Sequence, residues 1–112
     1  MSRPFYVYID VDDTFVRSHG ATRIAMPAVI EHIKELKEQG AVMYGGSSGG
    51  AEYAKESAIE FGVERCFVGF LPKPDLAIDD LTFSEWSGLL QVHPNECPRY
   101  TIESYKKKSL SQ

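Results

Sequence analysis

The feature that most limits the fold of this chain is an apolar run that stops at a cluster of carboxylates. Residues Phe5 to Ile9 are apolar at every position, and Asp10, Asp12 and Asp13 follow almost directly. A run without polar alternation, rich in aromatic and β-branched residues, is typical of a strand buried on both faces of a parallel sheet. The run therefore predicts a central strand, with its aromatic side chains in the core and three aspartates beyond its carboxyl end.

Strand and helix patterns alternate beyond this run. The polar stretch 17–23 is expected to be a loop. Residues 27–40 predict a helix, because a proline opens the stretch, a glycine closes it and apolar residues recur at spacings of three and four. His32 is expected on the solvent side of that helix. Residues 51–61 predict a second helix, and short apolar runs predict four further strands at 41–44, 66–70, 76–78 and 89–93. The order of elements predicts an α/β fold with a mostly parallel central sheet.

Length and charge limit the class of protein. The 112 residues, 43% hydrophobic and 25% charged, suit a single domain spanning 1–112. Twelve Lys and Arg against 16 Asp and Glu give a formal net charge of −4, which disfavours non-specific binding to nucleic acid or to an anionic membrane. No run approaches the ~20 apolar residues of a membrane span, and no apolar signal core follows the N-terminus. We therefore expect a cytoplasmic protein with reduced cysteines and no membrane partner.

Polar groups follow the expected strands at the edge where α/β sheets carry their sites. Two carboxylates ~4 Å apart repel by about 4 kcal/mol at an effective dielectric constant near 20. A cation such as Mg²⁺ relieves that repulsion in the first cluster, and Asp79 with Asp80 could share the ion. The loop Gly45 to Gly50 precedes a helix, so its backbone amides could cradle a phosphate. Lys73, between two prolines, could neutralise charge near both groups.

Together these residues resemble the haloacid dehalogenase-like (HAD) hydrolase superfamily over residues 5 to about 90. That family carries Asp-x-Asp-x-Thr after the first strand, Ser or Thr after the second, a Lys, and an acidic pair after the fourth. Here the four motifs are Asp10 to Thr14, Ser47 or Ser48, Lys73, and the pair Asp79-Asp80.

The chain departs from the family pattern at two points. Asp13 replaces the usual glycine and adds a charge beside the expected metal. Gly45 and Gly46 stand where a bulkier residue is common, which would widen or loosen the pocket.

The resemblance implies a Rossmann-like core, a three-layer α/β/α sandwich with a mostly parallel central sheet. It also implies a Mg²⁺-dependent phosphohydrolase acting on a phosphomonoester. Asp10 would be the nucleophile that forms an aspartyl-phosphate, and Asp12 the general acid and base. Ser47 and Lys73 would hold the phosphoryl oxygens. The substrate-binding residues implied are Asp13, Thr14, Ser47, Ser48, Gly49 and Lys73. The metal ligands implied are Asp10, Asp12, Asp79 and Asp80, with either of the last two as the direct ligand.

The resemblance also bears on the substrate. Only residues 15–26 separate the first motif from the first helix, too few for a cap domain. Among relatives, a capless and open site goes with macromolecular substrates, or with small ones covered by a neighbouring subunit. We therefore expect a phosphorylated substrate of either kind, with a homo-oligomer as one form of the protein.

The alternative is a regulatory module that binds phosphate or metal without turnover, either HAD-like or receiver-like. A receiver domain of a two-component system has a similar length, an early acidic pair and a Lys-Pro. It also needs a phosphoacceptor aspartate after the third strand, but no aspartate occurs between Asp13 and Asp75. Measured turnover would separate the two readings.

Overall fold

The first predicted strand forms one edge of a parallel sheet. The computed structural model describes residues 3–86 and 88–110. In it β1 (Tyr6–Asp10) pairs with β4 (Val42–Ser47), and β4 pairs with β5 (Gly69–Pro72), all in parallel. The order β1-β4-β5 and its register place Asp10 beside Gly46, and Ser47 beside Pro72. The carboxyl ends of the three strands therefore share one edge of the sheet.

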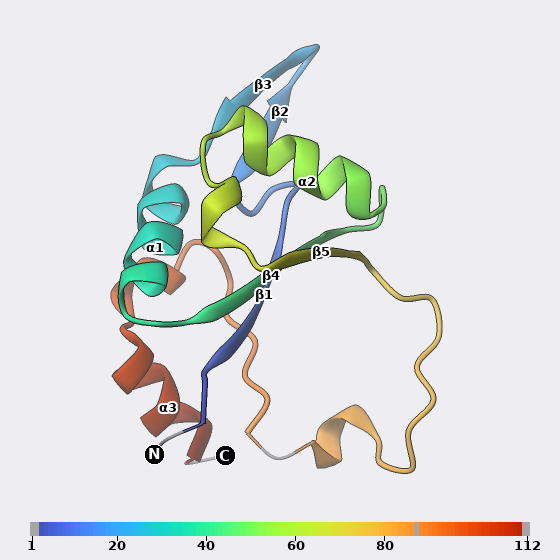
Figure 1. The fold of residues 1–112 in the computed structure, drawn as a ribbon, viewed down its shortest axis with the longest axis vertical. Helices are drawn as coiled ribbons and strands as arrows, with labels where there is room; N and C mark the ends of the chain where they lie inside the picture. The colour runs from blue at the N-terminus through green and yellow to red at the C-terminus, as the bar shows by residue number, and fades with distance from the viewer. Residues whose placement is uncertain (1–2, 87, 111–112) are drawn as a thin grey trace.

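Three α-helices accompany the sheet in the part of the chain that is described (Figure 1). Both predicted helices are confirmed as α1 (Pro27–Glu38) and α2 (Ala51–Glu60), and α3 (Ile102–Leu110) follows near the C-terminus. The inward residues of α2 are small, so this helix can approach the sheet closely. The molecule is thus a small α/β domain with a parallel sheet, as predicted. Among the described residues, however, this sheet has three strands rather than five, and β1 is an edge strand rather than a central one.

The prediction of a loop at 17–23 is wrong. These residues form most of an antiparallel hairpin, β2 (Val16–His19) and β3 (Thr22–Ala25), with Gly20 in the left-handed region at φ 63° in its turn. The hairpin pairs through its backbone and is anchored by the buried Val16, so it needs no alternating apolar pattern in sequence. It projects past the carboxyl end of the sheet, beside α2 (Figure 1).

The segment after β5 holds no strand among its described residues, so the strands predicted at 76–78 and 89–93 are wrong. Its first part runs away from the sheet as an extended loop that contains the 3₁₀ turn Phe83–Glu85 (Figure 1), and a second 3₁₀ turn, Cys97–Arg99, precedes α3. Leu76 is 76% exposed and Ile78 is 92% exposed, so the run that suggested a strand has no surface to bury against. Pro74 also lacks the amide that would continue ladder pairing. The third strand lies slightly later than predicted, because Glu64–Cys66 forms a 3₁₀ turn ahead of it.

The core lies between the helices and the sheet. Its fully buried large side chains come from the turn after β1, the first residue of β2, the inner faces of α1 and β4, and the α2–β5 connection. They are Val11, Phe15, Val16, Ile33, Met43 and Val63. Cys66 and Cys97 form no disulfide.

Three side chains differ from expectation in their exposure. His32 is 4% exposed, because Tyr105 of α3 packs against the side of α1 that was expected to face solvent. Conversely, Tyr6 and Tyr8 are about half exposed, since β1 is an edge strand and its aromatic side chains are not all covered.

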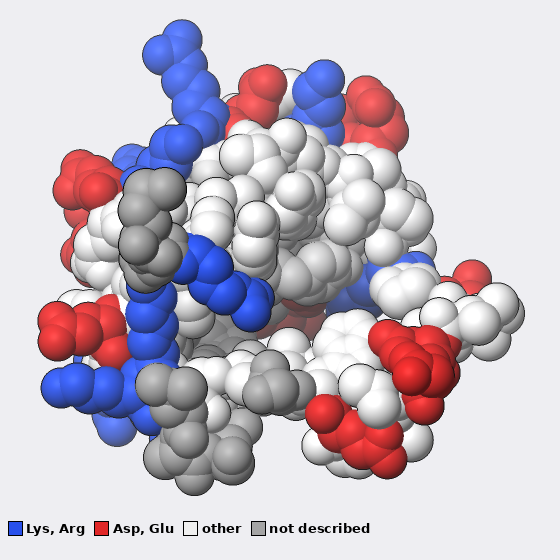
Figure 2. Space-filling view, turned by 60° about the horizontal axis from the view of Figure 1, so that its bottom comes forward, with Lys and Arg blue, Asp and Glu red and all other residues white. Residues whose placement is uncertain are grey.

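Surface charge is mixed on the face that Figure 2 shows. Acidic side chains gather at the lower right of this view and basic ones stand mainly on its left, while uncharged residues occupy much of the centre. Separately, no helix within residues 3–86 and 88–110 is both long and apolar enough to cross a bilayer.

Candidate functional site

The carboxylate of Asp10 is held by two side chains at the end of β1. Lys73 Nζ lies 3.2 Å from Asp10 Oδ1, and Thr14 Oγ1 donates a hydrogen bond to Asp10 Oδ2 at 3.3 Å. The Asp10 side chain is 28% exposed and that of Lys73 is 47% exposed. Lys73 is placed by the sheet itself: it follows β5, and its backbone amide donates to the Ser47 carbonyl at 3.0 Å. Two residues predicted from distant motifs thus meet as a solvent-accessible ion pair.

The turn after β1 is tightly bonded. The carbonyl of Val11 accepts the amides of Thr14, Phe15 and Val16 at 3.1, 3.1 and 3.3 Å, and the Asp13 amide donates to the Val16 carbonyl at 2.7 Å. Asp13 has φ 59°, in the left-handed region. Aspartate tolerates this conformation better than most residues, so it can stand where the resembling family has glycine. The Asp13 side chain is exposed, and the turn is held by the backbone hydrogen bonds described above.

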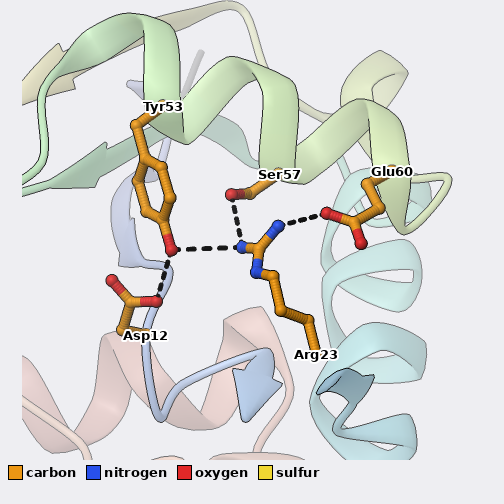
Figure 3. Close-up of polar contacts among 5 residues, drawn as sticks. All are labelled: Asp12, Arg23, Tyr53, Ser57 and Glu60. Carbon is orange, nitrogen blue, oxygen red and sulfur yellow. Dashed lines mark hydrogen bonds and ion pairs between the residues drawn. The ribbon is translucent and has the colours of Figure 1, made fainter. Parts of the chain in front are cut away.

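The carboxylate of Asp12 is hydrogen-bonded by a side chain of α2. Tyr53 OH donates a hydrogen bond to Asp12 Oδ1 at 2.7 Å (Figure 3). The pKa of Tyr53 is raised above its usual value, mainly because ionisation would lose this hydrogen bond and secondarily because of burial. Arg23 of β3 donates in turn to Tyr53 OH at 3.2 Å.

Tyr53 and Arg23 were not predicted as site residues. The available signal for Tyr53 was its position in the first turn of a helix that follows the glycine loop directly. Arg23 carried no such signal, because its stretch was expected to be a loop.

The two serines lie on either side of the end of β4, because Ser47 is its last residue and Ser48 begins the turn that follows. Ser47 is 1% exposed, and its Oγ accepts a hydrogen bond from the Gly49 amide at 3.0 Å. Ser48 is exposed. Ser47 therefore shapes the loop from within at the strand end nearest Asp10, whereas Ser48 presents its hydroxyl to solvent. Either remains a candidate contact for a phosphate.

The two glycines of β4 make room for aromatic rings. A Cβ at Gly46 would lie 2.0 Å from Tyr8 OH, and one at Gly45 would lie 3.0 Å from Phe70 Cδ1. These rings occupy the space in which a widened pocket was expected. Burial raises the pKa of Tyr8, the charge of Lys73 lowers it and that of Asp10 raises it, so the phenol lies within electrostatic reach of the ion pair. Tyr8 is thus a further residue beside the site that sequence analysis assigned to the core.

The acidic pair Asp79-Asp80 lies in the exposed segment after β5. Asp79 Oδ1 accepts a hydrogen bond from the Leu81 amide at 2.9 Å, and this bond is the main reason that the pKa of Asp79 is lowered. Within the described part of the chain, no three His, Cys, Asp or Glu side chains lie where they could hold a metal ion together. As placed, Asp79 and Asp80 do not complete a Mg²⁺ site with Asp10 and Asp12.

The arrangement offers a solvent-accessible carboxylate beside an ammonium, and a second carboxylate oriented by a phenol. These groups suit nucleophilic attack on an electrophile that carries negative charge, assisted by proton transfer. Comparison of the chain with protein-family models, with curated proteins and with solved structures finds no match.

Proposed function

We propose that this protein is a phosphohydrolase that acts through an aspartyl-phosphate on Asp10. The observation that supports the proposal is the 3.2 Å contact between Lys73 Nζ and Asp10 Oδ1. A bare carboxylate repels a phosphate dianion, by about 4 kcal/mol per pair of unit charges 4 Å apart at a dielectric constant near 20. An ammonium at this position offsets that repulsion and can bind a phosphoryl oxygen as its charge develops.

The reaction would take place in two steps. An oxygen of Asp10 attacks phosphorus, the bond from phosphorus to the leaving oxygen breaks, and protonated Asp12 gives its proton to that oxygen. Water then attacks the phosphorus of the aspartyl-phosphate, and Asp12 takes a proton from that water molecule. The bond between phosphorus and the Asp10 oxygen breaks, inorganic phosphate leaves and Asp10 is regenerated.

Several finer expectations belong to the same proposal. They are a three-layer α/β/α arrangement, a capless HAD-like core, a phosphorylated substrate that is either a small molecule or a macromolecule, and a cytoplasmic location. Mg²⁺ is also part of it, although the placement of Asp79 and Asp80 does not support that ion. The steps above depend on the side chains of Asp10, Asp12 and Lys73 alone.

The test is hydrolysis of an aryl phosphate and of a broad phosphate-ester panel, with Mg²⁺ and with a chelator in parallel. Asp10→Asn should abolish turnover, and Lys73→Met should lower kcat/KM strongly. Asp75→Asn, the same change at an exposed aspartate outside the site, is the matched control and should have little effect. In acid-quenched samples, mass spectrometry should detect a phosphoryl adduct on Asp10. Absence of turnover across the panel in both conditions would refute the proposal.

A second candidate function rests on the same contacts, because Lys73 and Thr14 hold the Asp10 carboxylate within reach of solvent. A module with Asp10, Lys73 and Thr14 could bind a phosphoryl group without turning it over. Beryllium fluoride, tested with and without Mg²⁺, should then raise the melting temperature of the wild type and not of Asp10→Asn, while no phosphate is released from any ester.

A further inference from the structure

The β2–β3 hairpin reaches α2 through one arginine. The guanidinium of Arg23 donates to Ser57 Oγ at 2.8 Å and to Tyr53 OH at 3.2 Å, and forms an ion pair with Glu60 (Figure 3). These three partners lie on one face of α2, at spacings of four and three residues. Ser57 is fully buried, so one of the three anchors cannot move without disturbing the core.

Arg23 also restrains the tyrosine ring. Its guanidinium carbon lies 5.3 Å from the centre of the Tyr53 ring and 5.6 Å from that of Phe61. Cation–π contact of this kind favours one orientation of each ring. Tyr53 is thus held both at its face and at its hydroxyl by the same side chain.

The donor and acceptor roles follow from the chemistry of the three groups. Arginine has no acceptor, so Tyr53 OH accepts from Arg23 and has its single proton left for another partner. That proton points to Asp12 Oδ1, 2.7 Å away. A hydrogen bond from a neutral donor to a carboxylate is charge-assisted and directional. One oxygen of the otherwise exposed Asp12 is therefore occupied, and Oδ2 is left for a substrate or a water molecule.

We propose that Tyr53 and Arg23 are positioning residues, which hold the Asp12 carboxylate in one orientation and so make the hairpin part of the reaction centre. The proposal rests on the proposed function, because it concerns the proton transfer assigned to Asp12. Arg23 acts only through Tyr53. Without the phenol, an exposed aspartate is free to populate several rotamers, and few of them aim an oxygen at the leaving group.

The kinetic test uses Tyr53→Phe, which removes only the hydroxyl. A misplacement of about 1 Å can cost ~100-fold in rate, so we expect kcat to fall by about 10- to 100-fold while KM changes by less than about twofold. Arg23→Gln should have a similar effect, and Arg23→Lys a smaller one. The double variant should be no slower than the slower single variant, because both changes break one chain of contacts. The matched controls are Tyr6→Phe at an exposed tyrosine and Arg17→Gln on the same hairpin.

A second readout is independent of turnover. With ¹³C at tyrosine Cζ, the Tyr53 resonance is identified by its absence in Tyr53→Phe. It should shift in Asp12→Ala and in Arg23→Gln, and not in Arg17→Gln. An unshifted resonance in Asp12→Ala would overturn the positioning proposal whether or not the protein hydrolyses esters.

The kinetic outcomes separate this proposal from the proposed function. An active wild type with unchanged kcat in Tyr53→Phe would overturn the positioning role and leave the phosphohydrolase intact. A fall in kcat that disappears after correction for the folded fraction at the assay temperature would also overturn it, since that is the result of a purely structural role. An inactive wild type would overturn the reaction itself, and with it any role for Tyr53 in that reaction.

Discussion

Acidification should destabilise this protein through one buried histidine. His32 of α1 is 4% exposed, and its Nε2 lies 2.8 Å from Tyr105 OH. Tyr105 OH donates its own proton to the Cys97 carbonyl at 3.0 Å, so Nε2 must be the donor to Tyr105. His32 Nδ1 is then a buried acceptor, and it has no hydrogen-bond partner among residues 3–86 and 88–110. Protonation would turn it into a buried donor, also without a partner.

The direction of the pH effect follows from the pKa of His32. Burial lowers that pKa in the folded protein, opposed in part by the negative charge of Glu35. In the unfolded chain a histidine titrates near pH ~6.5. Above that pH the ring is neutral in both states and contributes nothing. As the pH falls through this value, the unfolded state takes up a proton that the folded state does not. The free energy of unfolding then falls by up to about 1.4 kcal/mol per pH unit until the folded pKa is reached.

Urea unfolding between about pH 7.5 and pH 5.5 measures this loss, in a window above the titration of ordinary carboxylates. His32→Gln keeps a donor for Tyr105 and cannot be protonated, so its stability should depend less steeply on pH than that of the wild type. His19→Gln, at an exposed histidine of β2, is the matched control and should follow the wild type. Parallel pH profiles for the wild type and His32→Gln would refute the reasoning.

Three further predictions concern stability in urea unfolding. Gly46→Ala should lower the free energy of unfolding by about 1 kcal/mol, because the new methyl group collides with the Tyr8 ring. This loss is at the low end for overpacking, since the half-exposed ring can move aside, and it should disappear in a Tyr8→Leu background. Asp13→Gly should leave stability unchanged or raise it, whereas Asp13→Ala should lower it by about 1 kcal/mol, since φ is 59° there. Ile78→Ser should change stability by less than about 0.5 kcal/mol, and a larger loss would mean that residues 76–78 pack as a strand after all.

Local pattern was enough for much of the framework. The apolar run ending in Asp10 predicted β1, and the proline, the glycine and the apolar spacing between them predicted α1 nearly to its ends. These predictions succeed because strand and helix periodicity depend only on residues that are close together in the sequence. The meeting of Asp10 with Lys73 was foreseeable for a related reason: parallel strands bring their carboxyl ends to one edge, so residues 63 positions apart (73 − 10) become neighbours.

Other features depended on tertiary packing alone. The polarity of residues 17–23 indicated a loop, but one buried anchor and backbone pairing are enough for a hairpin. The apolar pattern at 76–78 indicated a strand, but no surface exists there to bury it. The environment of His32 was decided by α3, which docks from the far end of the chain.

The candidate site also combines features that sequence pattern predicted with features that depend on tertiary packing. Sequence pattern was enough to identify the carboxylates that end β1 and the lysine that follows β5, because both depend on strand ends and sheet order. The contacts of Asp12 depend on tertiary packing, since Tyr53 and Arg23 lie 41 and 11 residues away along the chain. Tyr53 reaches Asp12 because α2 docks beside it, and Arg23 reaches Tyr53 because the hairpin bends toward α2. Tertiary structure also left Asp79 and Asp80 apart from the first cluster. Hydrogen bonds between side chains of distant elements depend on how those elements pack, and no local periodicity encodes that geometry.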